Sequence, residues 1–188
     1  ATVRCGGRDW TLARKDWPAG MDQWGHPRHA AGGNAVSGDR IVGPPRRIRW
    51  VTGPSREISS MVTADGRNYY GGVWTRDSFN GLPLWERRIK PSPARGNFGY
   101  RQSRGSVPPV AGDGKLFAVN AGTLEALDAD TGELVRRYDK AGAPHTVRYL
   151  DGMLVVCDGE SVRALDAGDG SLRWHTAANR PRYLVAGA

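Results

Sequence analysis

The sequence predicts an all-β fold: a β-propeller of four-stranded blades, with about three blades plus partial blades, forming a segment of a larger propeller. A gap-free repeat of 38 residues runs through the C-terminal half of the chain. Each copy contains short strand-like segments separated by glycine turns, and no stretch shows a sustained helical period. Four strands in about 40 residues is typical of one propeller blade.

The repeat is clearest between residues 113–138 and residues 151–176, where the second copy reproduces the ALDA-x-x-G corner of the first. A more divergent copy lies at residues 65–89, and the insertion at residues 90–106 separates it from the other two. The expected organisation is an irregular entry segment at residues 1–45, followed by propeller blades at residues 46–188. Within the second part, blades are expected at about 55–90, 105–140 and 145–178, and a further blade is expected to start at residues 182–188.

Each copy is expected to form four strands in sequence order. The first strand precedes an Asp-Gly turn, the second and third are short apolar or alternating segments, and the fourth follows an Asp-x-x-x-Gly turn. Pro108 and Pro109 weaken the first strand of the middle blade, because proline cannot donate a hydrogen bond to a neighbouring strand. Residues 46–51 are expected to form an outer strand ahead of the first complete blade.

The Asp-x-x-x-Gly corner raises the question of whether its acidic residues bind a metal. Asp128, Asp130 and Glu133 form an acidic cluster, but an EF-hand loop needs a ligand where Gly132 stands, and it lies between helices. A carboxylate that ends a strand accepts backbone N–H groups two or three residues on, and glycine supplies positive φ. We therefore interpret three corners as structural turns: Asp77 with Gly81, Asp128 with Gly132, and Asp166 with Gly170.

Large side chains occupy the position four residues after the corner glycine. Trp85 and Trp174 stand there in the first and last copies, and Arg136 stands there in the middle copy. A tryptophan at this position can wedge between neighbouring blades and bury much apolar area, and an arginine can stack there less well. The alternative is a surface aromatic that binds a ligand.

The chain is basic, with a net charge of +8 and 27 basic residues, only four of them lysines. Its densest basic run, Arg46, Arg47 and Arg49, alternates with Ile48 and Trp50, which we interpret as an exposed strand face. The alternative is a nucleic-acid patch, which usually gathers charge on one face and interleaves aromatics. No apolar run approaches the roughly 20 residues that cross a bilayer.

Two cysteines, Cys5 and Cys157, lie far apart and form no C-x-x-C motif, which argues against a cysteine zinc site. A single disulfide between them is one interpretation. Cys157 follows an apolar run, and we interpret it as a buried thiol. The N-terminal residues contain no apolar signal-peptide core.

The repeated corner followed by tryptophan resembles the pyrroloquinoline quinone (PQQ)-like repeat over residues 59–188. In that family the tryptophan and the turn residues lock adjacent blades together. The resemblance implies a propeller fold that serves both quinoprotein alcohol dehydrogenases and non-enzymatic scaffolds similar to the outer-membrane assembly lipoprotein of the β-barrel machinery, so it does not by itself imply an activity. It also implies a periplasmic or exported location.

Residues 9–54 resemble the entry segment of planctomycete-type PQQ-like propeller proteins. That pattern is carried by Trp24, His26 and His29, then Asn34, while Ala30 replaces the aspartate that follows the second histidine in the pattern. His26 and His29, with Asp22 and Asp39 nearby, are the nearest thing to metal ligands in the chain. Two histidines rarely hold a metal without a carboxylate or thiolate, so we interpret them as hydrogen-bonded residues of the entry segment.

These observations favour a non-enzymatic scaffold or binding module, with a protein partner or the remaining blades of a larger propeller as its contact. No catalytic residue is assigned. The alternative is part of a PQQ-dependent quinoprotein oxidoreductase, with PQQ and calcium as cofactors, although the sequence does not reveal its metal ligands. A third hypothesis, an anion- or nucleic-acid-binding surface, rests on charge alone. The expected functional loops are residues 90–106 and the entry residues 24–34.

Overall fold

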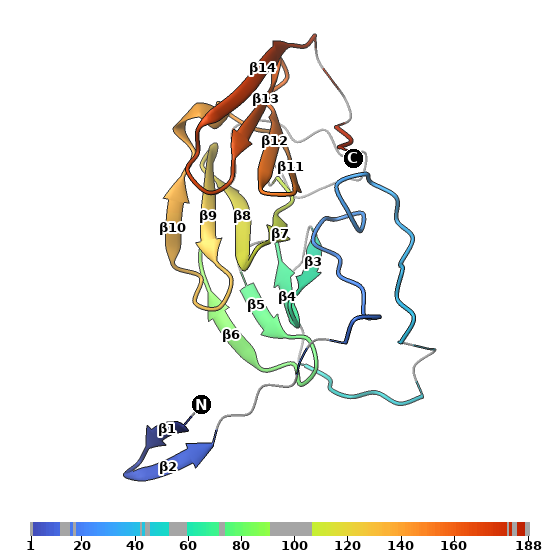
Figure 1. Ribbon diagram of the computed structural model, residues 1–188, viewed down its shortest axis with the longest axis vertical. Coiled ribbons are helices and arrows are strands. Elements are labelled where there is room, and N and C mark those ends of the chain that lie inside the picture. Colours follow the sequence, from blue (N-terminus) through green and yellow to red (C-terminus); the bar gives the residue numbers. More distant parts are fainter. Residues whose placement is uncertain are drawn as a thin grey trace.

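The structure is a computed structural model that describes residues 2–11, 16, 18–41, 43, 46–52, 60–71, 74–90, 107–179, 181 and 184–186. Within these residues, three four-stranded antiparallel sheets follow one another along the chain and lie side by side as a fan (Figure 1). The sheets do not close into a ring. The predicted all-β propeller fold is confirmed, in the form of an open array of blades.

The three sheets are numbered here as blades 1 to 3, and each pairs its strands in sequence order. Their strands are, for blade 1, β3 (Met61–Ala64), β4 (Arg67–Tyr70), β5 (Trp74–Asp77) and β6 (Pro83–Glu86); for blade 2, β7 (Val110–Gly112), β8 (Lys115–Asn120), β9 (Thr123–Asp128) and β10 (Leu134–Arg137); for blade 3, β11 (Thr146–Leu150), β12 (Met153–Cys157), β13 (Ser161–Asp166) and β14 (Leu172–Ala177). A hairpin of β1 (Thr2–Cys5) and β2 (Arg8–Thr11) lies apart from the blades, and a short 3₁₀ turn, η1 (Asp139–Ala141), follows β10 (Figure 1).

The first strand of each blade lies on the inside of the fan, and the fourth lies on the outside (Figure 1). β7 contacts both β3 and β11, so the three first strands are neighbours. The exposed residues of β10 and β14 agree with an outer position. We call the free edges of β3, β7 and β11 the inner edge.

The core lies between the blades, because strand side chains alternate between two faces. In β8, Leu116 packs toward blade 1, in a cluster with Val62 and Tyr69. Phe117 packs toward blade 3, in a cluster that includes Leu154 and other residues of β12 and β13. The near-continuous apolar sequence of β8 therefore reflects burial on both faces.

The first turn of each blade is a tight hairpin turn with positive φ at both central residues. In blade 2 these are Asp113, with φ 50°, and Gly114, with φ 64°, and the Asp-Gly pairs of the other two blades have the same character. This is the geometry that matches strand twist, and Asp-Gly is a preferred pair for it. The local sequence alone therefore predicts where each of these hairpins turns.

One strand prediction was wrong. Residues 46–52 contain no strand, because no neighbouring strand pairs with them, and the arginines of this run are exposed on an irregular segment. The further blade predicted to start at residues 182–188 stays a prediction: the structure describes only residues 184–186 of it, where one backbone hydrogen bond joins Ala186 N–H to the Ala31 carbonyl (3.1 Å). A strand needs a partner edge, and residues 46–52 have none among the described residues.

The weakening effect of the two prolines is visible in β7, which begins at Val110 and has three residues. The division between entry segment and propeller at residue 45 stays a prediction. Most of the insertion, residues 91–106, lies outside the described residues. No helix among the described residues is long and apolar enough to span a bilayer.

Candidate functional site

The carboxylate of each Asp-x-x-x-Gly corner is used by the turn itself. Asp128 Oδ1 accepts the backbone N–H groups of Asp130 and Thr131, both at 2.9 Å, and also the Thr131 hydroxyl (3.1 Å). Gly132 N–H bonds the Asp128 carbonyl (2.9 Å), with φ 73° at the glycine. These contacts support the turn interpretation over the metal interpretation at this corner.

The other two corners repeat the arrangement. Asp77 Oδ1 accepts N–H groups two and three residues on, at 2.8 and 3.0 Å, and Gly81 has φ 74°. Asp166 Oδ1 does the same at 2.8 and 3.0 Å, and Gly170 has φ 78°. A hydrogen bond from the side chain of Arg173, with those backbone N–H groups, lowers the pKa of Asp166 to about 2. No group of three or more His, Cys, Asp or Glu side chains in the described part of the chain could hold a metal ion.

Trp85 joins blade 1 to blade 2. Its indole N–H donates to the Ala129 carbonyl of the blade 2 corner (3.0 Å), and its ring lies over Gly132, where an added β-carbon would be 2.6 Å from ring atoms. The ring also meets Tyr69, with centroids 6.1 Å apart. The corner glycine therefore has two roles: it permits positive φ and it makes room for the tryptophan of the preceding blade.

Trp50 makes the same contact one step earlier. Its indole N–H donates to the Ser78 carbonyl (3.2 Å), and its ring lies within 2.5 Å of where a β-carbon would stand on Gly81. Although residues 46–52 form no strand, Trp50 occupies the position that a tryptophan from a preceding blade would occupy. The repeat pattern could not identify Trp50, because the residue four positions before it is Arg46, whereas Trp85 follows the corner glycine Gly81 by four residues.

The junction of blades 2 and 3 uses two side chains instead of one tryptophan. Arg136 donates to the Asp169 carbonyl (3.0 Å), and the Tyr138 hydroxyl donates to the Ala167 carbonyl (2.6 Å). Both pack near Gly170, at 3.5 to 3.7 Å from its hypothetical β-carbon, which is looser than at the tryptophan junctions. Burial raises the pKa of Tyr138 to about 12, so its hydroxyl keeps the proton that it donates. The sequence comparison missed Tyr138 because no other copy has tyrosine there.

Trp174 stands at the matching position of blade 3, but its side chain is 44% exposed. Every residue of its strand, β14, is exposed. Among the described residues, no further blade offers it a corner glycine. Blade 3 therefore exposes Trp174, whereas the equivalent tryptophan of blade 1, Trp85, docks onto the next blade.

A buried carboxylate strengthens the junction of blades 1 and 2. Glu125 on β9 is 3% exposed, and its oxygens contact Arg137 (3.1 Å) and Arg87 (3.5 Å). The Asn120 amide donates to the same carboxylate (3.2 Å). Arg87 follows β6 of blade 1, so this ion pair crosses the junction.

Three consecutive residues of the entry segment bind the inner edge, one blade each. Trp24 exchanges two backbone hydrogen bonds with Thr63 of β3, both at 2.8 Å. The Gly25 carbonyl accepts from the Ala111 N–H of β7 (2.6 Å), and His26 Nε2 accepts from the Tyr149 N–H of β11 (3.0 Å). These residues satisfy donors that would otherwise be unpaired, and they cover the free edges of all three blades.

His26 and His29 are brought together, but both are already engaged. Their backbones form a two-way bridge, at 3.2 and 3.3 Å, and His29 Nε2 contacts Asp22 Oδ2 at 2.7 Å. Because His26 Nε2 accepts a backbone N–H, its lone pair is not free for a metal. The sequence-based interpretation of these histidines as hydrogen-bonded entry residues agrees with these contacts.

Asp22 organises the rest of the entry segment. Its carboxylate accepts from the backbone N–H groups of Gly38 (2.6 Å) and Gln23 (2.8 Å), and from the Ser37 hydroxyl (3.0 Å). Burial alone would raise the pKa of Asp22, but these bonds and the contact with His29 outweigh it and lower the pKa to about 2. Asp39, the other candidate acid, accepts N–H groups of Asp22 and Ile41.

The stability of the protein is expected to rise with pH between about 4 and 6.5 because of His26. Burial, and then the charge of Arg148, lower the pKa of His26 from 6.5 to about 4. The unfolded chain therefore binds a proton that the folded chain excludes in this window, and acidification costs stability. The full effect is about 3 kcal/mol. Thermal unfolding at several pH values measures it, and His26→Gln, which keeps an acceptor for Tyr149 N–H, should flatten the profile. An unchanged slope in that variant would assign the effect to other groups.

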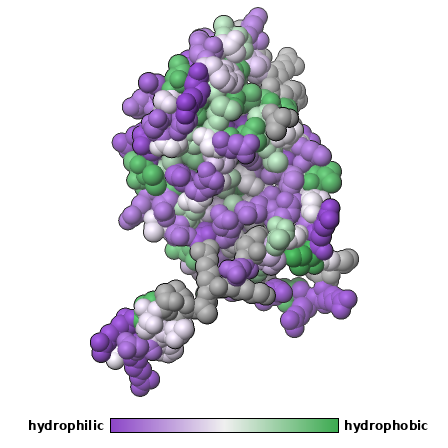
Figure 2. Space-filling model, viewed as in Figure 1, coloured by the Kyte–Doolittle hydropathy of each residue, from purple (hydrophilic) through white to green (hydrophobic). Residues whose placement is uncertain are grey.

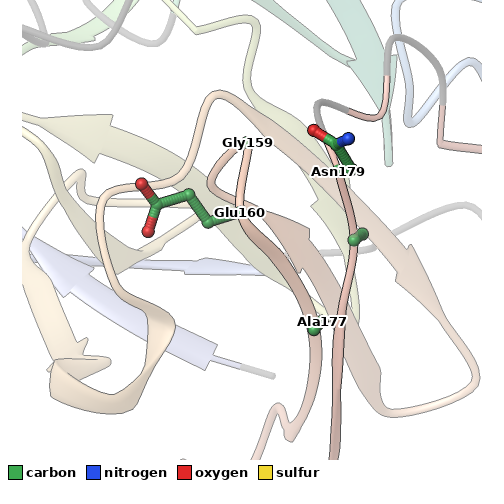
Figure 3. A pocket seen from close by; sticks show the side chains of 5 residues that line it. Gly159, Glu160, Ala177 and Asn179 are labelled. Atoms are coloured by element: carbon green, nitrogen blue, oxygen red, sulfur yellow. The ribbon is translucent and has the colours of Figure 1, made fainter.

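The other chemical features of the described residues do not form a constellation of reactive groups. Cys157 is buried, 3.7 Å from His145 Nε2, and burial raises the pKa of its thiol. Cys5 is exposed, and both cysteines are free, so the disulfide interpretation was wrong. Figure 3 shows a pocket at the end of blade 3, where Glu160 and Asn179 point in different directions and the other lining residues are small. The face shown in Figure 2 is mostly hydrophilic, with apolar residues scattered over it.

Comparisons with known proteins bear on the blades. Residues 71–187, more than half of the chain, match the family model described as outer membrane protein assembly factor BamB. Among solved structures, a europium-containing methanol dehydrogenase is similar at 17% identity, with a TM-score of 0.56, over 83% of this chain and 32% of that one. No curated protein matches the chain.

Two further solved structures are similar at lower TM-scores. A quinohemoprotein alcohol dehydrogenase from Pseudomonas putida matches at 22% identity, with a TM-score of 0.48, over 63% of this chain and 20% of that one. BamB from Moraxella catarrhalis matches at 18% identity, with a TM-score of 0.41, over 62% of this chain and 32% of that one. The chain thus spans a third or less of the length of these three structures.

Proposed function

The chain belongs to the PQQ-like β-propeller repeat family, and from this premise we propose that it is a non-enzymatic scaffold or binding module. The partner that its chemistry fits is a further propeller blade, supplied by the same protein or by another protein. A periplasmic or exported location is part of the proposal. The planctomycete-type likeness of residues 9–54 stays a prediction.

The observation that supports this function is the contrast between three tryptophans. Trp50 and Trp85 each lie on a corner glycine, and each indole N–H donates a hydrogen bond to the blade that contains that glycine. Trp174 has the equivalent sequence position, and its side chain is 44% exposed. An exposed tryptophan with a polar N–H at one end is typical of a contact residue, since it buries a large area at little entropic cost.

Trp174→Ala is expected to weaken association of the purified chain with its partner blade by at least about tenfold, as at a tryptophan hot spot. Sedimentation of the native protein measures the association. It gives the mass of the assembly and the change of that mass with protein concentration. An assembly mass above 20.4 kDa for the wild type, and a smaller mass for Trp174→Ala, would support the proposal.

Trp10→Ala is a suitable control for that experiment. Trp10 is 59% exposed, and it lies on the separate hairpin instead of on a blade. Its loss should leave association unchanged. A wild-type chain that remains a stable monomer at all concentrations, with no blade partner in the native protein, would contradict the proposal.

The alternative function is part of a PQQ-dependent oxidoreductase. In such enzymes the quinone lies on the propeller axis, and the described residues do not fit it there. The inner edge is covered by residues 24–26, and Gly25 lies so close to β7 that a β-carbon would be 2.4 Å from the Ala111 carbonyl oxygen. A quinone on the axis would have to displace this segment.

Added PQQ and calcium are therefore expected to leave the protein without quinone absorbance and without a change in melting temperature. Absorption spectra after gel filtration, with differential scanning fluorimetry, provide the measurement. Bound quinone at one equivalent per chain would favour the oxidoreductase. Binding of polynucleotide that falls steeply with salt would favour the third hypothesis, a nucleic-acid surface.

A further inference from the structure

Arg148 is the unusual charge of the inner edge. It lies in the middle of β11, and it is 9% exposed. One guanidinium nitrogen donates to the Val147 carbonyl (2.9 Å), while Nε is buried and has no hydrogen-bond partner among the described residues. Buried guanidinium groups are normally paired, because removing a charge from water without a partner is costly.

A second arginine adds positive charge near Arg148. Burial lowers the pKa of Arg148, and the charge of Arg28 in the entry segment lowers it further. His26 lies close enough for Arg148 to lower the pKa of the imidazole in turn. In the described ion pairs, Asp22 is engaged by His29, and no carboxylate contacts Arg148.

The two arginines come from different parts of the chain, Arg148 from β11 of blade 3 and Arg28 from the entry segment, and their charges interact. Arg148 faces away from the packed junction with blade 2, because its neighbours Val147 and Tyr149 are the residues that pack into that core. Arg28 is exposed, two residues after His26, whose ring binds the Tyr149 N–H. Arg148 is therefore the buried arginine of the pair, and Arg28 is the exposed one.

We propose that the inner edge of blade 3 binds a small oxyanion, such as inorganic phosphate, between Arg148 and Arg28. The anion accepts hydrogen bonds from the free guanidinium donors of Arg148 and supplies the counter-charge that the described residues lack. A guanidinium presents paired N–H donors that match two oxygens of one anion, which a lysine cannot do. This site is independent of Trp174, so its failure and that of the proposed scaffold function are distinguishable.

The test is the melting temperature of the purified chain while sodium chloride is replaced by phosphate at constant ionic strength. The melting temperature of the wild-type protein is expected to rise by about 5 °C at saturating phosphate, because a ligand that binds only the folded state stabilises it. Arg148→Met, which keeps the length of the side chain and removes the donors, is expected to gain less than about 1 °C. Calorimetric titration with phosphate then gives the stoichiometry, expected to be one per chain.

Two further variants keep the result interpretable. Arg8→Met is a matched control on the separate hairpin, and it should respond to phosphate as the wild type does. Arg28→Met alters an exposed side chain, so it should fold even if Arg148→Met does not, and it should weaken phosphate binding by about tenfold, the loss of one charged hydrogen bond. The proposal is overturned if phosphate does not stabilise the wild type beyond chloride, or if Arg28→Met binds phosphate as tightly as wild type.

Discussion

Trp85→Ala is expected to lower the free energy of unfolding by about 3 kcal/mol, whereas Trp174→Ala lowers it by less than about 1 kcal/mol. The two residues share one repeat position, so their local sequence contexts are similar. Trp85 loses its contact with Gly132, its packing on Tyr69 and its hydrogen bond to Ala129. Trp174 loses little, because no described blade covers it.

Chemical denaturation of the two variants, followed by far-ultraviolet circular dichroism, measures this difference. The curve for Trp85→Ala should also broaden, since blades 1 and 2 lose their coupling and repeat arrays then unfold less cooperatively. Equal losses in the two variants would show that the tryptophans act within their own blades instead of between blades. The refolded Trp174→Ala protein serves as the matched control for loss of an indole ring.

Gly25→Ala is expected to release the entry segment from the inner edge at a cost of about 2–3 kcal/mol. The added β-carbon would lie 2.4 Å from the Ala111 carbonyl oxygen, well inside the roughly 3.5 Å of a favourable contact. The obstacle is the backbone of β7, so a side-chain rotation cannot relieve the clash. Release also breaks the neighbouring bonds of Trp24 and His26 to β3 and β11.

Hydrogen exchange gives a direct measurement, because one amide on each first strand donates to the entry segment: Thr63, Ala111 and Tyr149. All three amides should exchange faster in Gly25→Ala. Gly32→Ala is the matched control in the same segment, since its β-carbon would meet only the Ala186 carbonyl oxygen, at an ordinary 3.8 Å. Faster exchange at Ala111 alone would mean that the three contacts form independently.

The fold was predictable because its signals are local and repeated. Asp-Gly pairs and Asp-x-x-x-Gly corners dictate turns within a few residues of the chain, and alternation dictates the faces of the strands between them. The corner glycines were identified for their φ angle. Their second role, making room for the tryptophan of another blade, involves residues far apart in the sequence, such as Trp85 and Gly132.

The strand predicted at residues 46–51 was wrong because the pattern that predicted it is local, whereas strand pairing is not. Its alternation is typical of a strand, but alternation gives no partner, and a strand exists only where another edge supplies hydrogen bonds. The same limit explains why Trp50 was not assigned a docking role, although its contact with Gly81 matches that of Trp85. The sequence pattern indicated which side chains of this segment share a face. Whether the segment pairs with another strand depends on residues elsewhere in the chain.

By itself, the sequence determined the class of fold, the number of complete blades, the turn chemistry of Asp77, Asp128 and Asp166, and the kind of side chain that joins one blade to the next. These are properties of neighbouring residues, set by backbone sterics and short-range hydrogen bonds. Only the tertiary structure decided that Trp24, Gly25 and His26 cover three blades in order, that Trp174 is exposed, and that Arg148 is buried without an acidic partner among the described residues. Those features depend on contacts between residues that are far apart in the sequence. The free energy of burying a side chain or pairing a charge is set by those contacts, so it cannot be inferred from neighbouring residues alone.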